Sequence, residues 1–303
     1  MRDAFIAELT NLAAADPSIM LITGDLGFGV LTEYAERFPD QFLNAGVAEQ
    51  NMTGLACGLA LEGHKVYTYS IANFTTLRPL EQIRNDVCYH DADVTLVSVG
   101  GGFSYGQLGM SHFATEDLAI LRALPNMEVI APVDPWETTQ LTRQMAARSG
   151  PKYLRLDKGR AGTPETQVDL GKIRQVRDGS DVTLIGIGAI VSEALAAAQT
   201  LSTLGVEARV LAVHSLKPLD TDPILAAANE TGGIITVEEH NIIGGLGGAV
   251  AETCLEAGAA PGFFRRVGLQ DQYPSVVGDQ NHLRAAYDMD APAIVSAVLQ
   301  ARG

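Results

Sequence analysis

The sequence predicts an α/β protein made of two doubly wound domains with mainly parallel sheets. Apolar, β-branched runs alternate with helical patterns along most of the 303 residues, which is typical of parallel sheets covered by helices on both faces. The alternation stops over 161–180, where glycine, proline and charged residues gather, and it resumes afterwards. A chain of this length also suits two domains of ordinary size.

The first domain is expected over 1–160. It begins with an amphipathic helix in MRDAFIAELTNLAAADP and continues with buried strands and the helices that connect them. The expected strands cover 19–25, 65–71, 93–101, 127–134 and 152–157, and the expected helices cover 47–62, 75–90, 115–123 and 135–149. Strands of this continuous apolar kind are buried on both faces.

The second domain is expected over 181–303, after a linker at 161–180. Its strands are expected at 181–188, 207–216, 233–240 and 263–269, again separated by helices. GIGAIVSEA and GGLGGAVAE look at first like dinucleotide-binding loops. The first lacks the third glycine of that motif, and the second lies late in the domain. We interpret both as tight turns between a strand and a helix.

The composition argues against several kinds of partner. A formal net charge of −15 disfavours a nucleic-acid or anionic membrane surface, and no apolar run reaches the roughly 20 residues needed to span a bilayer. Three scattered cysteines form no pair motif, and the N-terminus lacks a signal-peptide pattern, so we expect a cytoplasmic protein. The six histidines never occur at ligand spacing with cysteines or carboxylates, so no metal site is expected within this chain.

One carboxylate, Glu49, lies in NAGVAEQNMTGLACGLAL (44–61), a segment whose other residues predict burial. Burying an ionised carboxylate without a partner costs several kcal/mol. Such a residue therefore becomes neutral, finds a partner or faces a ligand. The residues of this segment do not decide among the three.

Two further stretches carry polar residues near expected strand ends or on an expected helix. His112 lies in the glycine-rich stretch GGGFSYGQLGMSHFATEDLAILR, after a strand and before a helix. Ligands bind at the carboxyl ends of strands in doubly wound sheets, so His112 is a candidate site residue as well as a candidate helix-entry residue. In FTTLRPLEQIRN, Arg78, Glu81 and Arg84 share a helical face, which by spacing alone predicts ion pairs on an exposed helix.

Taken in order, five stretches resemble blocks of the transketolase family of thiamine diphosphate enzymes. They are GDL (24–26), FPDQFLNAGVAEQNMTGLACGLALEG (38–63), NFTTLRPLEQIRN (73–85), SHFATEDLAILRALPNMEVIAPVD (111–134) and HSLKPLD (214–220). The resemblance covers essentially the whole chain, and GVAEQN and EQIRN are its most specific parts. It implies the C-terminal half of a transketolase, a pyrimidine-binding domain followed by a transketolase C-terminal domain.

The resemblance implies how the chain treats the cofactor. Glu49 matches the family glutamate that hydrogen-bonds the aminopyrimidine ring and activates the cofactor, which makes it a catalytic residue. Phe74 matches the aromatic residue that stacks on that ring. Asp25, in the GDL turn, and Arg78 are expected beside the cofactor as well.

The resemblance also implies substrate contacts. His112 matches a catalytic histidine that contacts the substrate or intermediate, and Arg2 and Arg155 match arginines that hold a substrate phosphate. Three positions depart from the family pattern: Gly29 replaces a serine, Gly100 a histidine, and Leu108 an aspartate that recognises a sugar hydroxyl. Leucine removes a polar partner and adds apolar surface, so we expect a less hydroxylated substrate than that of ordinary transketolases.

No G-D-G triplet occurs in the chain, although family members bind Mg²⁺ and the diphosphate through that motif. The resemblance therefore implies the pyrimidine-domain subunit of a split transketolase. A separate transketolase N-terminal, diphosphate-binding subunit would supply most of the Mg²⁺ site. We expect an α₂β₂ assembly that acts on small molecules in carbohydrate metabolism, and no activity from this chain alone.

The expected reaction transfers a two-carbon ketol unit from a ketose or ketose phosphate to an aldehyde or ketone. Three alternatives share part of the pattern. Two use a 2-oxo acid: the β subunit of a 2-oxo-acid dehydrogenase and an enzyme of the deoxyxylulose phosphate synthase type. The third is a binding subunit that keeps the fold without catalysis, which the presence of Glu49 and Phe74 disfavours.

Overall fold

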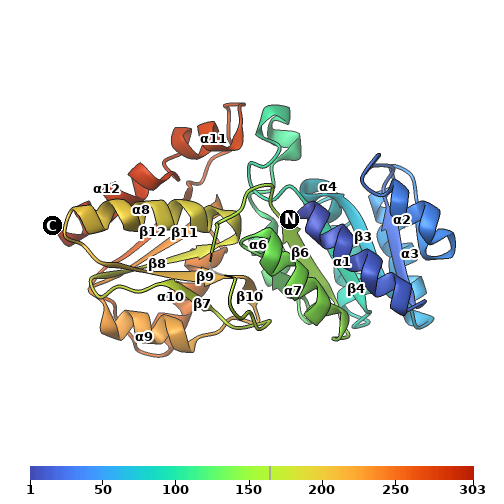
Figure 1. The fold of residues 1–303 in the computed structure, drawn as a ribbon, viewed down its shortest axis with the longest axis horizontal. Coiled ribbons are helices and arrows are strands. Elements are labelled where there is room, and N and C mark those ends of the chain that lie inside the picture. The colour runs from blue at the N-terminus through green and yellow to red at the C-terminus, as the bar shows by residue number, and fades with distance from the viewer. Residues whose placement is uncertain (164) are drawn as a thin grey trace.

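The computed structural model describes residues 1–163 and 165–303 and contains two sheets, one in each half of the chain (Figure 1). The first sheet has the strand order β10-β5-β6-β4-β3-β1-β2, and the second has the order β12-β11-β8-β9-β7. Residue 164, within the expected linker, lies outside the described residues. The prediction of two mainly parallel α/β units is confirmed.

Six strands of the first sheet are parallel to one another: β1 (Ile19–Thr23), β2 (Phe42–Asn44), β3 (Lys65–Ile71), β4 (Val94–Val99), β5 (Glu128–Ile130) and β6 (Lys152–Leu156). Helices α1 (Arg2–Ala15) and α7 (Pro135–Ala146) bury Phe5, Leu9 and Leu141 against one face. Helices α3 (Glu49–Leu61) and α6 (Asp117–Arg122) cover the other face. Both faces are therefore buried, as the continuous apolar strands predict.

The second sheet contains β7 (Arg174–Arg177), β8 (Val182–Ile187), β9 (Ala208–Val213), β11 (Ile234–Asn241) and β12 (Phe264–Leu269). All pairs are parallel except β7 with β9. The helices α8 (Val191–Thr203) and α12 (Ala291–Arg302) lie together on one face, and α9 (Asp222–Glu230) and α10 (Leu246–Glu256) lie on the other (Figure 1).

The expected strand at 207–216 is in fact two strands in different sheets. β9 ends at Val213, and β10 (Ser215–Lys217) joins the first sheet antiparallel to β5, with Ser215 opposite Ile130. One apolar cluster accordingly runs from Val129 of the first domain to Leu211 of the second. The two domains are thus joined by a strand and a shared core.

Two short strands and one broken helix differ from the expectations. β2 and β7 are short edge strands with partly exposed side chains, so their apolar signal is weak. β7 belongs to the second sheet although it lies within the expected linker. The expected helix at 75–90 is divided into α4 (Ala72–Thr76), α5 (Leu80–Gln82) and a π-helical turn (Ile83–Cys88), because Pro79 provides no N–H for a continuous helix.

Among the described residues, no helix is both long and apolar enough to cross a bilayer.

Candidate active site

Glu49 is the first residue of α3 and is only 4 % exposed. Gly24, in the turn after β1, lies so close that a Cβ atom there would be 3.8 Å from Glu49 Oε1. The surrounding segment is less buried than its sequence predicts, because Val47 is 70 % exposed and Leu61 is 61 % exposed. The carboxylate is therefore buried at the edge of an uncovered apolar surface.

Arg78 is the partner of Glu49 in this structure. Its Nη1 atom lies 2.9 Å from each carboxylate oxygen of Glu49. The same guanidinium lies over the ring of Phe74, with Cζ 3.9 Å from the ring centroid. By spacing alone Arg78 would pair along its own helix, but it forms its ion pair with Glu49. Arg78 thus satisfies the buried carboxylate and covers an aromatic face at once.

His112 lies at the edge of Phe74, with ring centroids 5.2 Å apart. Ser111 Oγ is 2.9 Å from His112 Nδ1, and Asn73 Nδ2 donates to the Ser111 carbonyl at 2.9 Å. These bonds fix the short 3₁₀ turn Met110–His112 against α4. The predicted site residues Glu49, Phe74, Arg78 and His112 therefore come together in one place.

Asp25 is exposed in a left-handed turn with φ of 56°, next to Gly24. Its carboxylate accepts a hydrogen bond from Asn44 Nδ2 at 3.0 Å, and its N–H donates to Asn44 Oδ1 at 3.1 Å. The turn lies at the carboxyl end of β1, one residue from the glycine that contacts Glu49. Asp25 therefore lies one residue from Gly24, but the hollow at Glu49 is lined by other residues, among them Val47 and Arg78.

Three consecutive glycines at the carboxyl end of β4 make room for different side chains. A Cβ atom at Gly100 would collide with the ring of Tyr105. A Cβ atom at Gly101 would collide with Asp157 and Arg155, and one at Gly102 with Glu239. The glycine run is therefore required for close packing between the β4 turn, β6 and the second domain.

Arg155 is wholly buried and does not reach a surface where substrate could bind. Its Nε donates to Asp117 at 2.9 Å, and its Nη2 donates to the carbonyls of Ala114 and Glu239. Burial acts to lower the pKa of Arg155, but Asp117 and Asp157 outweigh it and raise that pKa above its usual range. In this structure Arg155 joins the two domains and is not placed to hold a substrate phosphate.

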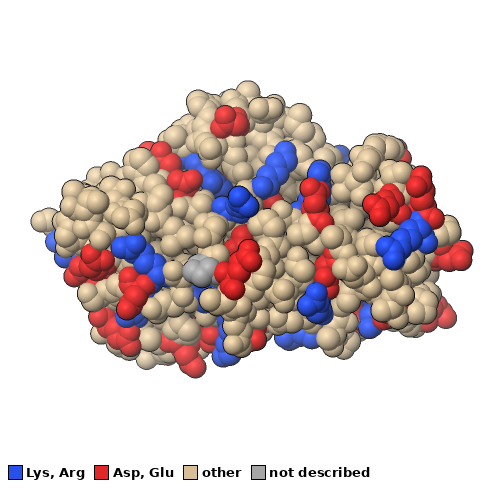
Figure 2. Space-filling view, viewed as in Figure 1, with Lys and Arg blue, Asp and Glu red and all other residues tan. Residues whose placement is uncertain are grey.

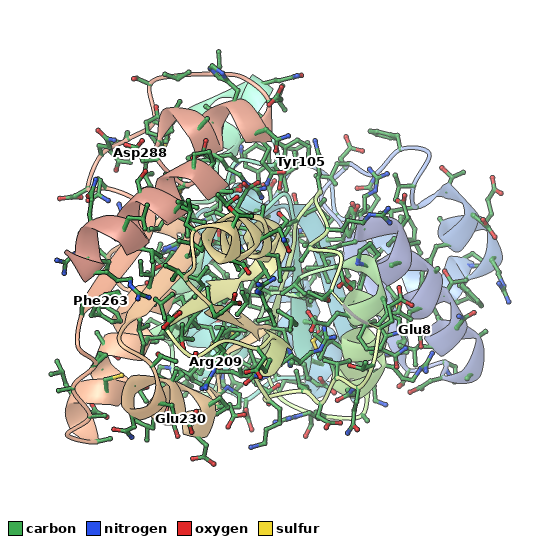
Figure 3. All side chains as sticks on the ribbon, turned by 60° about the vertical axis from the view of Figure 1, so that its left-hand side comes forward. Glu8, Tyr105, Arg209, Glu230, Phe263 and Asp288 are labelled. Atoms are coloured by element: carbon green, nitrogen blue, oxygen red, sulfur yellow. The ribbon has the colours of Figure 1, made fainter. Side chains whose placement is uncertain are left out.

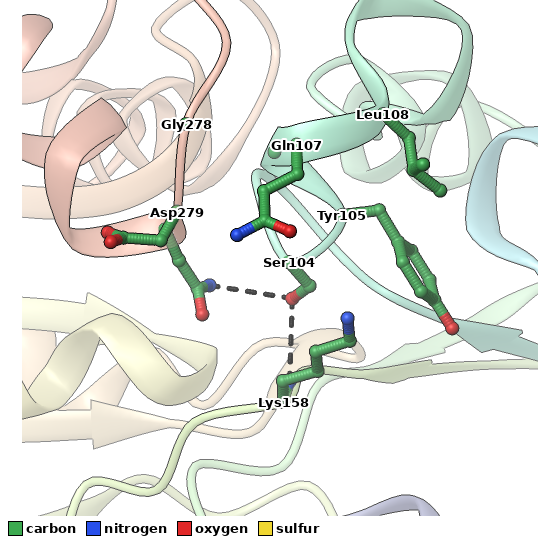
Figure 4. A pocket seen from close by; sticks show the side chains of 9 residues that line it. Ser104, Tyr105, Gln107, Leu108, Lys158, Gly278 and Asp279 are labelled. Carbon is green, nitrogen blue, oxygen red and sulfur yellow. Dashed lines mark hydrogen bonds between the residues drawn. The ribbon is translucent and has the colours of Figure 1, made fainter.

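Lys158, which the sequence reasoning did not select, is a cation that faces open space. It follows the end of β6 and lines a cavity of about 440 Å³ together with Ser104, Tyr105 and Gln280 (Figure 4). Burial and the nearby charge of Arg2 lower the pKa of Lys158. Its position after a parallel strand was the available signal, because such positions face ligands.

Arg2, at the start of α1, is partly exposed and pairs with Asp3 at 2.8 Å. Arg2 and Gly29, where the family has a serine, line the same hollow. Figure 2 shows several Lys and Arg side chains near the middle of one face of the molecule, among acidic side chains that are spread over the same face. A chain of net charge −15 therefore still offers local cations to an anion.

Among the described residues, no group of three or more histidine, cysteine, aspartate or glutamate side chains is arranged to hold a metal ion. Cys57, Cys88 and Cys254 are free and buried.

The chain resembles known proteins over nearly its full length. Residues 1–163 match the model for the transketolase pyrimidine-binding domain, and residues 171–294 match that for the transketolase C-terminal domain. One subunit of the apulose-4-phosphate transketolase of Phocaeicola vulgatus is 37% identical, covering 99% of this chain and 96% of that protein. The 1-deoxy-D-xylulose-5-phosphate synthase 1 of Geobacter sulfurreducens is 36% identical, covering 95% of this chain but 46% of that protein.

A solved structure agrees with these sequence matches. It is described as a split-gene transketolase in the form of an inactive β4 tetramer, and it superimposes with a TM-score of 0.88 at 35% identity. The match covers 99% of this chain and 97% of that one. By sequence and by fold, the chain belongs to the transketolase family, of which it carries the pyrimidine-binding and C-terminal domains.

Proposed function

We propose that this chain is the pyrimidine-domain subunit of a two-subunit, thiamine diphosphate-dependent transketolase. The complex would transfer a two-carbon ketol unit from a ketose or ketose phosphate to an aldehyde or ketone. The observation that carries the proposal is the buried carboxylate of Glu49, which Arg78 links to the ring of Phe74. The similarity to a named transketolase subunit over nearly the full length of both chains supports it.

The residues around Glu49 fit the aminopyrimidine of thiamine diphosphate. Arg78 already presents a flat, nitrogen-bearing group that donates to Glu49 and lies on Phe74. An aminopyrimidine would use the same two surfaces, one by hydrogen bonding and one by stacking. The bound cofactor supplies the nucleophilic carbon that cleaves the bond beside a donor carbonyl.

Each residue then has a distinct task. Glu49 holds a proton at the ring nitrogen of the cofactor, and its burial strengthens that hydrogen bond. Phe74 orients the aminopyrimidine ring by stacking on it. Arg78, which covers the Phe74 ring in this structure, moves away from it when the cofactor binds and remains at the rim of the site with Asp25. We assign to His112 the exchange of a proton with a substrate oxygen, and the contact of Ser111 with its ring supports a fixed orientation.

We propose Arg2 and Lys158, in place of the buried Arg155, as the cations that hold a substrate phosphate. The Arg2 side chain is partly exposed, Lys158 is exposed, and Arg2 is close enough to lower the pKa of Lys158. Leu108 is 57 % exposed in the loop beside Lys158, so it offers apolar surface where an aspartate would offer a hydroxyl partner. This supports a substrate that is less hydroxylated than an ordinary pentose phosphate.

The remaining parts of the site come from other chains in this proposal. A diphosphate-binding subunit supplies the Mg²⁺ ligands, and two copies of each subunit form an α₂β₂ enzyme. The free, buried cysteines support a place in the reducing cytoplasm.

Reconstitution tests the proposal. This chain, co-expressed with a partner that bears a G-D-G motif, is assayed with thiamine diphosphate, Mg²⁺, ketose phosphates and several aldehydes. Glu49→Gln is expected to lower kcat by at least about a hundredfold. Glu62→Gln, exposed just after the same helix, is the matched control and should leave kcat unchanged. If the Glu49→Gln complex keeps full turnover, this chain would instead be a binding subunit that retains the fold without taking part in catalysis.

A 2-oxo acid donor is the second candidate function, because the synthase relative is 36% identical over most of this chain. The same complex is therefore incubated with pyruvate and an aldehyde acceptor. Release of CO₂ coupled to turnover would identify a decarboxylating enzyme. Turnover of a ketose without CO₂ identifies a transketolase.

A further inference from the structure

The ring of Tyr105 occupies the space that a side chain at position 100 would otherwise fill. Gly100 follows β4 with φ of 94°, and its N–H donates to the carbonyl of Leu156 at 2.7 Å. A Cβ atom at Gly100 would collide with the Tyr105 ring, so the ring lies directly where a side chain at position 100 would project. The Tyr105 ring therefore takes the place of a side chain at position 100, directly after β4.

The ring of Tyr105 lies against the Lys158 cation and close to the His112 imidazole. Lys158 Nζ lies 3.9 Å from its centroid, and Arg2 is close enough for its charge to influence the phenol. The ring of His112 lies 6.4 Å away, edge to face. Tyr105 is found where the two domains meet (Figure 3), and Figure 4 shows the Lys158 side chain between Tyr105 and Ser104.

Contacts with the second domain fix the loop that carries Tyr105. Phe103 N–H donates to Glu239 Oε1 at 2.6 Å, and Gly278 N–H donates to the carbonyl of Gly106 at 3.3 Å. Ser104 Oγ donates to the carbonyl of Gly101 at 2.8 Å. The residues on both sides of Tyr105 are therefore anchored, and the position of its ring is a property of the fold.

We infer that Tyr105 is a specificity-determining residue: its ring is the wall between the anion-binding cations Arg2 and Lys158 and the reacting end of the site at His112. The inference deepens the proposed function and rests on it. The wall admits an acceptor aldehyde whose anionic group lies beside Lys158 and whose chain is narrow where it passes the ring. The phenol hydroxyl offers that anion a further donor.

Paired acceptors test this inference in the reconstituted enzyme. Glyceraldehyde 3-phosphate and glyceraldehyde differ by the anionic group alone, so the ratio of their kcat/KM values measures discrimination. Tyr105→Ala is expected to change this ratio by about tenfold or more, mainly through KM for the phosphorylated acceptor. Tyr105→Phe keeps the wall and should change the ratio by about threefold or less. Gly100→Ala, which displaces the ring, should change the ratio in the same direction as Tyr105→Ala.

The controls distinguish an effect of the Tyr105 ring on specificity from a general effect on folding or on the cofactor site. Tyr105→Leu repeats the measurement if Tyr105→Ala unfolds, and calorimetric titration with thiamine diphosphate checks that the cofactor site of each variant is intact. An unchanged ratio would overturn the inference, even if kcat/KM falls by the same factor for both acceptors. A wild-type complex without transferase activity would instead refute the proposed function.

Discussion

At the scale of single residues, the site is organised by one ion pair, and its two side chains differ greatly in their exposure to solvent. Glu49 is buried, whereas the Arg78 side chain is 46 % exposed. Removing Arg78 leaves a buried carboxylate that has lost its cation, and an unsatisfied buried group costs about 1–3 kcal/mol. Because the guanidinium is half in solvent, we place the expected loss at the lower end of that range.

Arg78→Met is therefore expected to lower the unfolding free energy of the isolated chain by about 1 kcal/mol, measured by urea denaturation. In the assembled enzyme, the affinity of the Arg78→Met variant for thiamine diphosphate should stay within about threefold of wild type, because the cofactor takes the place of Arg78 on the Phe74 ring. Arg84→Met is the control, since Arg84 donates to the adjacent Asn85 and not to Glu49. A tenfold loss of affinity would instead make Arg78 a direct ligand of the cofactor.

Lys158 gives the site a pH dependence. Its pKa is lowered, so it loses its proton at a lower pH than an ordinary lysine, and anion binding is lost as pH rises through that pKa. KM for a phosphorylated acceptor is expected to rise with pH in the alkaline range, whereas KM for the unphosphorylated aldehyde stays flat. Lys158→Arg keeps its charge throughout and should remove the rise. The same rise in both acceptors would exclude Lys158 as its cause.

At the scale of elements, the start of α10 depends on a side chain from a neighbouring strand. Glu238 of β11 accepts hydrogen bonds from the N–H groups of Leu246 and Gly247 at 2.7 and 2.9 Å. A Cβ atom at Gly245 would collide with this carboxylate, so the glycine lets strand and helix approach. Burial raises the pKa of Glu238, against the opposing effect of His240.

Glu238→Gln keeps the shape but turns an NH₂ group toward one of these donors. We expect a loss of about 1–3 kcal/mol in unfolding free energy, measured by urea denaturation. Glu252→Gln, an exposed change in the same helix, is the matched control and should cost less than about 1 kcal/mol. Equal stability of the two variants would show that Glu238 is not needed as a cap.

Sequence patterns predict elements best where the residues have one environment. β4 is buried at every position and was predictable from its apolar run. The run 207–216 also looked continuous, but His214 marks a change from one sheet to another that hydrophobicity does not encode. Glu49 could be selected because a family motif surrounds it. Tyr105 could not, because its role depends on the space that Gly100, by lacking a side chain, leaves for the tyrosine ring.

At the scale of the whole molecule, buried charges connect the domains. Glu239 accepts from Phe103 N–H and Gln280, and it pairs with Arg284. Arg155 continues this network to Asp117 of the first domain. The resemblance to transketolases suggested a substrate role for Arg155, because a match of sequence position does not reveal that the side chain is buried.

Arg155→Met is expected to lower the unfolding free energy by about 3–5 kcal/mol, because Asp117 loses its buried partner. Thermal and urea unfolding of the full chain measure the loss. Lys158→Met, three residues away and facing open space, should leave stability nearly unchanged and raise KM for phosphorylated acceptors. If Arg155→Met were stable and raised KM for phosphorylated acceptors as Lys158→Met does, Arg155 would be a phosphate-binding residue after all.

The surface around Glu49 indicates how the active enzyme assembles. Val47 lines the hollow at Glu49, Leu77 precedes Arg78, and Leu55 lies on the same helix as Glu49; all three are exposed apolar residues. We expect the diphosphate-binding subunit to cover them. Val47→Glu should leave the fold of the isolated chain intact but weaken assembly by about tenfold or more, because a charge would be buried at the interface. Sedimentation measures assembly, and titration with thiamine diphosphate measures the completed site.

Leu255→Glu is the matched control, since Leu255 is 80 % exposed on α10 of the second domain. That change should leave both assembly and cofactor binding as in wild type. The isolated wild-type chain should bind thiamine diphosphate far more weakly than the complex, because it has no G-D-G motif to hold the diphosphate. Tight binding by the isolated chain, or normal assembly by Val47→Glu, would mean that the surface beside Glu49 does not form the shared site.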